Sequence, residues 1–353
     1  MADPAPPRVP AASLRRFVAE ALIKVGLPAT DAATCAELMV RADLQGADGH
    51  GIFRLPQYVR RIKGGAVNVK ANVRIAREAA GMALVEGDNG MGHVVMSFAT
   101  RTAIEKAKTA GAAWVGVRNS NHAGPASLYA SMPLEHDMIG LYLAVGNANH
   151  MAPWGGIDLL LSTNPIAVAV PGNEGPIVLD MATSVAAYGK VKTAAQRGET
   201  MPEGWMIDRE GRPLTDPKRA DEGMLVPIGG YKGYGLALVF GLLAGTLNGA
   251  AMGSDTIDFN ADDTTPTNTG HAIVAISIAA FGELDEVKRR VDKLAREIRR
   301  SRPLPGLARI WLPGEQSRAK FEERSQLGVP IPSPLRTSLD KLAHELKIAA
   351  LKA

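Results

Sequence analysis

The chain has 353 residues, 46% of them hydrophobic and 22% charged, so it can bury a sizeable core and is unlike a disordered protein in composition. Its formal net charge is +4, its basic residues are scattered, and only 5% of its residues are aromatic. These features argue against a nucleic-acid binder, which would carry a basic stripe with interleaved aromatic side chains.

A single cysteine, Cys35, excludes a disulfide within the chain. We expect it to be a small buried helix residue in a protein of the reducing cytoplasm. Prolines interrupt the amino-terminal segment where a signal peptide needs an apolar run, so we expect no secretion. The longest apolar segment, residues 235–245, is shorter than the roughly 20 residues of a membrane span and predicts a buried helix.

The first part of the chain predicts helices. Residues 1–12 are rich in Pro and Ala and indicate a disordered tail. Ser13 is expected to cap a first helix, and Thr30 or Asp31 a second. A third helix should begin near Arg54 and end at a pair of glycines.

From about residue 80 the sequence changes to short apolar runs bounded by turn residues. A helix is expected over residues 96–111, and a second polar loop of disordered appearance over residues 253–270. Residues 197–227 predict a long polar loop with a hairpin-like turn at 208–211. Strands are expected within residues 82–93, 112–124, 137–156, 159–172, 175–184 and 271–278.

The carboxyl-terminal part predicts two amphipathic helices, 283–301 and 333–348, with a turn at 313–315 between them. Strands separated by helices indicate a mixed α/β (α+β) fold. We expect a helical, substrate-binding unit built from residues 13–78 and 283–353 and a cofactor-binding α/β unit from residues 79–282.

Gly49-His50-Gly51 is the first candidate site. Glycines allow the backbone to approach a ligand closely, and the following helix directs its free N–H groups toward this turn. Arg54 offers a planar fork for a carboxylate, and Tyr58 lies one helical turn further on. A histidine beside a cation and a helix start has a lowered pKa, which suits a general base. The alternative is a histidine that only caps the helix, with Arg54 paired to Asp48.

His122 is the second candidate, because a predicted strand ends in a polar loop that presents this histidine before a helix. The side chains of residues 119–121 could fix the tautomer of its ring. The alternative is a loop histidine that caps the next helix. His150 is expected to be structural.

Further polar positions follow apolar runs, among them Asn147, Thr163 and Asp180. Each could contact a ligand or serve a turn or a helix cap. Gly229–Gly235 resembles a phosphate-binding glycine loop with Lys232 as the point charge, but it matches no complete motif. No Rossmann fingerprint, zinc-hydrolase motif or metal-ligand spacing of histidines is present, so we expect no metal site.

Taken in order, these segments resemble the malate/L-lactate dehydrogenase family of NAD(P)-dependent oxidoreductases that lack a Rossmann fold. That family also holds ureidoglycolate and sulfolactate dehydrogenases and cyclic-imine reductases. The resemblance covers about residues 40 to 315. The matching stretches are DGHGIFRLPQY, NSNHAGPASLYA, APWGG, STNPIAVAVP, LDMATS, PEGWMIDREG, GYKGYGLAL and LPGE.

The resemblance implies a non-Rossmann cofactor domain with a mostly antiparallel sheet, a homodimer, and NAD or NADP as the cofactor. It implies that His122 and His50 are catalytic and that the substrate, a small carboxylate, is bound by Arg54, Tyr58 and Thr163. The cofactor-binding residues that it implies are Asn147, Asp180, Met181, Ala182, Lys232, Pro313, Gly314 and Glu315. It implies neither a nucleic-acid partner nor a membrane.

Two positions depart from the wider family. Gly49 stands where many members have a serine, and Lys190 stands where cyclic-imine reductases have an aspartate, which favours the hydroxy-acid branch. We therefore expect hydride transfer between NAD(P)H and a small 2-oxo or 2-hydroxy acid. Reduction of a cyclic imino acid, ligand binding without turnover, and metal-dependent hydrolysis are the alternatives.

Overall fold

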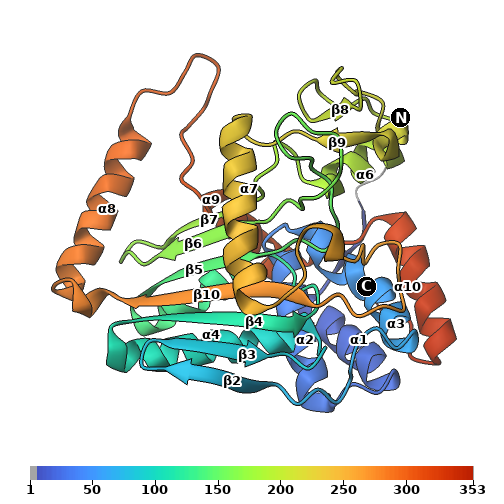
Figure 1. The fold of residues 1–353 in the computed structure, drawn as a ribbon, viewed down its shortest axis with the longest axis horizontal. Coiled ribbons are helices and arrows are strands. Elements are labelled where there is room, and N and C mark those ends of the chain that lie inside the picture. Colours follow the sequence, from blue (N-terminus) through green and yellow to red (C-terminus); the bar gives the residue numbers. More distant parts are fainter. Residues whose placement is uncertain (1–5, 353) are drawn as a thin grey trace.

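A seven-stranded sheet lies at the centre of the structure, a computed structural model that describes residues 6–352 (Figure 1). Among the described strands of this sheet, β3 and β4 run parallel and all other neighbours are antiparallel. The mixed α/β fold with a mostly antiparallel sheet is thereby confirmed. The strands, in their order across the sheet, are β2 (Arg74–Ala79), β3 (Met82–Glu86), β4 (Ala112–Ser120), β10 (Thr269–Ser277), β5 (Met138–Ala144), β6 (Ile166–Val170) and β7 (Ile177–Met181).

Two helices cover opposite faces of this sheet, α4 (Gly92–Ala110) and α7 (Tyr231–Ala244) (Figure 1). Strand β5 shows how the sequence makes both faces apolar, because successive side chains of a strand point to opposite sides. Its Tyr142 belongs to the α4 core, whereas Leu141 and Leu143 pack on the α7 side. The apolar runs found in the sequence are therefore central strands buried on both faces.

A cluster of helices packs against one end of the sheet and draws on both ends of the chain (Figure 1). It consists of α1 (Ala11–Lys24), α2 (Ala29–Leu44), α3 (Leu55–Lys63) and α10 (Ser333–Leu346), and β1 (Arg8–Val9) pairs with β11 (Val329–Pro330) beside it. Cys35 is fully buried in its core, as expected.

Helix α8 (Leu284–Arg300) lies away from this cluster, at the far side of the sheet (Figure 1). The carboxylate of Asp292 accepts the backbone N–H groups of Asn173 and Glu174, both at 3.2 Å, and so joins α8 to the turn between β6 and β7. The division of the chain at residues 79 and 282 stays a prediction.

Residues 187–227 form a small lobe with α6 (Tyr188–Arg197), β8 (Met206–Asp208) and β9 (Gly223–Leu225). The expected turn is present, since the N–H of Gly211 donates to the carbonyl oxygen of Asp208 at 3.1 Å. The remaining helices are α5 (Ser127–Ala130) and α9 (Glu315–Leu327). None of the helices in residues 6–352 is both long enough and apolar enough to cross a membrane.

Several expectations about element ends are wrong. Helices α1 and α2 begin at Ala11 and Ala29, directly after prolines with φ of −57° and −56°, so Ser13, Thr30 and Asp31 are not caps. Both prolines stand at the N-cap with extended ψ of 139° and 146°, where the missing N–H of proline costs no helical hydrogen bond. Of the expected tail, residues 1–5 lie outside the described residues, whereas residues 8–9 form β1 and residues 11–12 start α1.

The helix expected over residues 235–245 is present within α7, but the expectation that it is buried is wrong for one of its sides. In α7 the small residues Gly233, Ala237, Gly241 and Ala244 are buried against the sheet. The side chains on the opposite side are exposed to the extent of 41% for Leu236, 49% for Val239 and 43% for Leu242.

The loop before β10, which the sequence suggested to be disordered, is fastened to α3 by the buried side chain of Arg61. Its Nη1 donates to the carbonyl oxygen of Asp262 and its Nη2 to that of Thr265, the latter at 2.8 Å. Gln57 adds a bond of 2.6 Å from its Nε2 to the carbonyl oxygen of Phe259. Buried donors thus satisfy the carbonyl groups of an irregular segment and hold it in place.

We predict that Arg61→Met lowers the free energy of unfolding by about 1–3 kcal/mol, because buried carbonyl groups lose their donors. The neighbouring variant Arg60→Met is the control. Arg60 forms only an exposed ion pair with Asp263, so its loss should change stability by less than about 1 kcal/mol. Urea unfolding followed by circular dichroism measures both, and equal effects would contradict the anchoring role of Arg61.

Candidate active site

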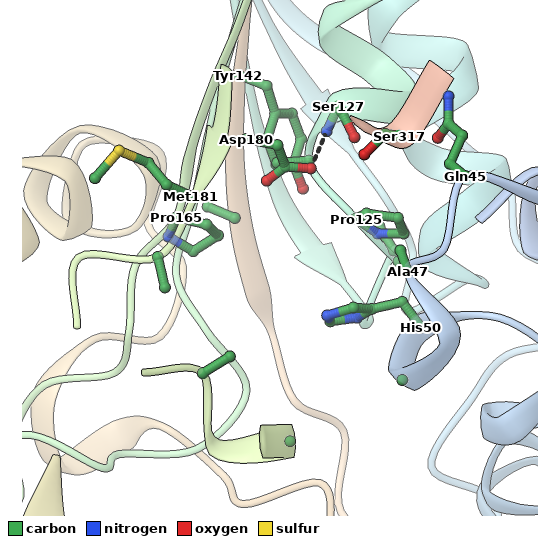
Figure 2. A pocket seen from close by; sticks show the side chains of 18 of the residues that line it. Gln45, Ala47, His50, Pro125, Ser127, Tyr142, Pro165, Asp180, Met181 and Ser317 are labelled. Carbon is green, nitrogen blue, oxygen red and sulfur yellow. Dashed lines mark hydrogen bonds between the residues drawn. The ribbon is translucent and has the colours of Figure 1, made fainter. Parts of the chain in front are cut away.

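A cavity of about 1030 Å³ lies between the helical cluster, the sheet and the small lobe. Figure 2 shows His50 directed into it, with Asp180 and Ser127 on the side formed by the sheet and its loops. The cavity is larger than most small-molecule pockets and has the size for a cofactor together with a substrate. Its walls come from the turn after α2, the loop after β4, strands β5 to β7, α6 and the first residues of α9.

The turn that carries His50 is held from below by a buried carboxylate. The residues Asp48–His50 and Ile52–Arg54 form two 3-10 turns. The N–H of Ile52 donates to Oδ2 of Asp43 at 2.8 Å, and a Cβ atom added to Gly51 would lie 1.9 Å from Oδ1 of the same residue. A Cβ on Gly49 would meet nothing within 4 Å. Of the two glycines that flank His50, therefore, only Gly51 leaves no room for a side chain.

Three side chains form a hydrogen-bonded row beneath the cavity. The hydroxyl of Tyr58 lies 2.6 Å from Nδ1 of His122, and Nε2 of His122 lies 3.3 Å from Nδ1 of His50. The two imidazole rings are nearly parallel, with an angle of 7° between their planes. The structure thus brings together the two histidines that the sequence singled out, although 72 positions separate them in the chain.

The hydrogen-bond partners of His122 differ from those expected from the sequence. Besides Tyr58, the N–H of Gly124 approaches Nδ1 of His122 at 3.4 Å. Asn119 and Asn121 are turned away, since the amide of Asn119 donates to Glu86 and that of Asn121 to the carbonyl oxygen of Gly90. The expectation that residues 119–121 fix the tautomer is therefore wrong.

Both histidines are neutral at pH 7. Burial lowers the pKa of His50 to about 4, and the positive charge of Arg54 contributes to the shift. The pKa of His122 also lies well below its ordinary value, first because of burial and then because of His50 and Arg54. The lowered pKa expected for His50 is confirmed, with loss of hydration as its main cause.

Arg54 lies at the edge of the cavity with its guanidinium fixed by neutral partners. Nε donates to the carbonyl oxygen of Gly49 at 2.8 Å, and Nη1 donates to Gln57 at 2.8 Å and to Asn260 at 3.2 Å. Asp48 pairs with Arg324 and not with Arg54, so the alternative interpretation of this arginine is wrong. No described carboxylate pairs with Arg54, and both N–H donors of Nη2 are left for a ligand.

Strand β7 supplies the expected residues on a second wall. Asp180, Met181 and Ala182 all line the cavity, as do Asn147 and Thr163 from neighbouring loops. One carboxylate oxygen of Asp180 accepts the N–H of Ser127 at 2.8 Å, which orients the group (Figure 2). Burial raises the pKa of Asp180, while its bond to Ser127 opposes that shift.

Two of the expected cofactor residues lie outside the lining. Pro313 and Gly314 border the cavity, but the Glu315 carboxylate turns away to accept the N–H of Leu312 at 2.9 Å and to pair with Arg299 at 2.7 Å. Lys232 is exposed in the first turn of α7 and does not border the cavity. The cofactor contacts assigned to these residues stay predictions.

Sequence reasoning missed one group of lining residues, on α6 and in the loop before β10. Tyr188 stacks on His150 with 3.9 Å between ring centroids, and Nζ of Lys192 lies 5.3 Å from the Tyr188 ring centroid. His150, expected to be structural, is itself part of the lining. No motif marks these residues, because their role comes from the packing of the small lobe against the cavity. The described residues contain no cluster of metal-ligating side chains.

A mixed α/β fold whose cavity holds two paired histidines and an arginine without a carboxylate partner fits the class that the sequence resemblance implies, the nicotinamide-dependent oxidoreductases without a Rossmann fold. The comparisons with known proteins specify the family. The model of the malate/L-lactate dehydrogenase family matches residues 9–340, and the chain belongs to that family.

Individual relatives cover nearly the whole chain. Malate dehydrogenase of Pyrococcus abyssi is 38% identical over 98% of this chain and 96% of its own length. The structure of sulfolactate dehydrogenase from Methanocaldococcus jannaschii superposes with a TM-score of 0.91 at 37% identity, covering 98% of each chain. The structure of Δ1-piperideine-2-carboxylate reductase from Pseudomonas syringae gives a TM-score of 0.84 at 28% identity, covering 96% of this chain and all of the other.

We predict that Gly51→Ala lowers the free energy of unfolding by about 1–3 kcal/mol, because the added methyl group would overlap the buried Asp43 carboxylate. Gly49→Ala is the matched control on the other side of His50, and it should unfold within about 0.5 kcal/mol of the wild-type protein. Chemical denaturation of the two variants gives the comparison. A Gly49→Ala variant as unstable as Gly51→Ala would contradict this account of the turn.

Proposed function

We propose that the protein is an NAD(P)-dependent dehydrogenase that interconverts a small 2-hydroxy acid and its 2-oxo acid. The observation that carries this proposal is the row Tyr58–His122–His50 beside Arg54, in a cavity large enough for a cofactor and a substrate. The proposal is supported by two relatives, a malate dehydrogenase and an L-sulfolactate dehydrogenase, each 38% identical to this chain.

The residues of the second wall fit a nicotinamide dinucleotide. Asp180 presents an oriented carboxylate, the kind of acceptor that ribose hydroxyls need, and Met181, Ala182, Pro313 and Gly314 supply surface beside it. Asn147 and Thr163 add polar groups. The chemistry supplied by the bound nicotinamide is transfer of a hydride to or from C2 of the substrate.

The histidine pair accepts the proton of the substrate hydroxyl in this proposal. Because both rings are neutral at pH 7, they can accept that proton as the hydride leaves C2. Their hydrogen bond lets one ring pass its shared proton to the other, so we propose that His50 and His122 act as one proton-accepting unit. Burial raises the pKa of Tyr58 well above its ordinary value, although the positive charge of Arg54 opposes the shift, so the hydroxyl stays protonated and fixes the orientation of His122.

Arg54 binds the C1 carboxylate in this proposal. Its Nε and Nη1 donors are already used by protein partners, so the carboxylate is held through Nη2 instead of through a full guanidinium fork. The fixed guanidinium needs no rearrangement when the substrate arrives, and it orients C2 toward the histidines.

We further propose a homodimer and a cytoplasmic location. The sequence resemblance implies a dimer, and the exposed face of α7 with Leu236, Val239 and Leu242 is apolar enough to be covered by a second copy. Measurement of the molecular mass in solution tests the homodimer. The single buried thiol of Cys35 suits a reducing compartment.

The function is tested by a substrate panel with NADH and NADPH, followed at the absorbance of the reduced nicotinamide. The panel contains pyruvate, oxaloacetate, 3-sulfopyruvate and the cyclic imine pyrroline-2-carboxylate. We expect turnover of at least one 2-oxo acid. Turnover of the imine alone would establish the alternative, a cyclic-imine reductase, and cofactor binding without any turnover would leave a binding protein.

We predict that His50→Ala and His122→Ala each lower kcat/KM for the 2-oxo acid turned over in this panel by about 10²–10⁴-fold. The double variant should be no more than a few-fold worse than the poorer single variant, because residues that act as a unit are not additive. Melting temperatures control for folding. Losses that multiply in the double variant would show that the two histidines act independently.

A further inference from the structure

An aromatic side chain borders the cavity, and the proposed function gives it no task. Trp311 lines the cavity and is 42% exposed. The segment that carries it lies directly against β7, because the N–H of Val178 donates to the carbonyl oxygen of Pro313 at 3.1 Å. A Cβ atom added to Gly314 would lie 2.9 Å from Cβ of Val178, so this close approach requires a glycine. Trp311 is thereby fastened to the last strand of the sheet.

Ion pairs with a buried carboxylate hold a guanidinium group against one face of this indole. Cζ of Arg309 lies 3.8 Å from the ring centroid of Trp311, and its Nη2 donates to Oε2 of Glu315 at 3.3 Å. The buried carboxylate of Glu315 also accepts Nε of Arg299, at 2.7 Å, and the N–H of Leu312. Because these partners fix Arg309 on one side of the ring, the other face of the indole is left for a ligand.

Trp311 belongs to the part of the cavity nearest the turn between β6 and β7. Arg299, which shares Glu315 with Arg309, comes within 3.9 Å of Glu174 in that turn, and Pro176, directly before β7, lines the cavity. Asp180 lies near the other end of β7, whose five residues span about 16 Å. The cavity therefore extends past the carboxylate that we assign to a ribose, as the second half of a dinucleotide requires.

A cation stands at the same end of the cavity. Arg318 lines the cavity, and a Cβ atom added to Gly175 would lie 1.8 Å from its Nη1, so the guanidinium rests against the turn between β6 and β7. Among the residues that the structure describes, no carboxylate forms an ion pair with Arg318. An open aromatic face beside an unpaired cation is the combination that binds a base together with its phosphates.

We propose that Trp311 stacks on the adenine of the nicotinamide cofactor and that Glu315 positions the indole through Arg309. This rests on the proposed function, because it requires a dinucleotide whose nicotinamide lies beside the histidine pair. Stacking suits the site, since a flat base covers the face of the indole that Arg309 leaves open. The same arrangement gives Glu315 a part in cofactor binding although its carboxylate does not border the cavity.

The test measures the binding of ADP-ribose, which carries the adenine and both phosphates of the cofactor but no nicotinamide, by isothermal titration calorimetry. Trp311→Leu should raise the Kd for ADP-ribose about 5- to 100-fold, the effect of losing one stack between a base and an aromatic ring. Trp311→Phe keeps a flat ring and should stay within about fivefold of wild type. Melting temperatures of the variants control for folding.

Phe281→Leu is the matched control, because it removes an aromatic ring that is 81% exposed and does not border the cavity. It should leave the Kd for ADP-ribose unchanged. An unchanged Kd in Trp311→Leu, or an equally large loss in Phe281→Leu, would overturn the inference.

A double-mutant cycle tests the positioning role of Glu315. Glu315→Gln keeps an acceptor for the N–H of Leu312 and removes the charge that holds Arg309. It should raise the Kd for ADP-ribose about 3- to 10-fold in the wild-type background and less than about twofold in the Trp311→Leu background, since coupled residues are not additive. Equal losses in both backgrounds would show that Glu315 does not act through the indole.

A spectroscopic readout keeps the inference separate from the proposed function. ADP-ribose should quench the indole fluorescence of the wild-type protein and leave that of Trp311→Leu almost unchanged, although three other tryptophans remain. If no 2-oxo acid is turned over, the proposed function fails, whereas the ADP-ribose titration still decides the role of Trp311. A wild-type protein that does not bind ADP-ribose, or binds it without a change in indole emission, would refute the stacking.

Discussion

The contact between Tyr58 and His122 joins two separately packed parts of the molecule. Tyr58 belongs to the core of the helical cluster, and His122 lies at the end of a central strand of the sheet. The cavity is the space that remains where these parts meet, so its shape depends on how they are fastened together. A bond of 2.6 Å between rigid elements places the histidine row more accurately than a flexible loop could.

Most of the side-chain hydrogen bonds that join these parts come from one face of α3. Gln57 and Tyr58 each lie three or four residues from both Arg54, which caps the helix, and Arg61, so these four side chains share one side of α3. Their polar groups bond to three irregular segments: Arg54 to the His50 turn, Tyr58 to the His122 loop, and Gln57 and Arg61 to the loop before β10. Because these segments have few backbone partners of their own, buried side chains take the place of a regular hydrogen-bond ladder.

Whether the sequence predicted a helix or strand depended on how much apolar surface that element buries. The central strands and α4, α8 and α10 have apolar positions at regular steps and were found close to their observed bounds. Strand β2 and helix α9 were missed, because β2 is exposed along its whole length and α9 buries only Glu315 and Arg324. Hydrophobic periodicity reports which side chains leave water, so an element that buries little apolar surface gives almost no signal. The sequence also could not show that one side of α7 is exposed, since its apolar residues surround the helix.

The sequence by itself determined the family, the mixed α/β class and the residue types of the site, because ordered motifs such as DGHGIFRLPQY and NSNHAGPASLYA survive in the linear chain. It also indicated that a histidine near Arg54 would have a lowered pKa. Only the tertiary structure decided that His50 and His122 form one pair, that Gly51 and not Gly49 is required, and that Lys192 faces the same cavity as Arg54. These relations join positions far apart in the chain through packing and loss of hydration, and neither quantity is a property of a local stretch of sequence.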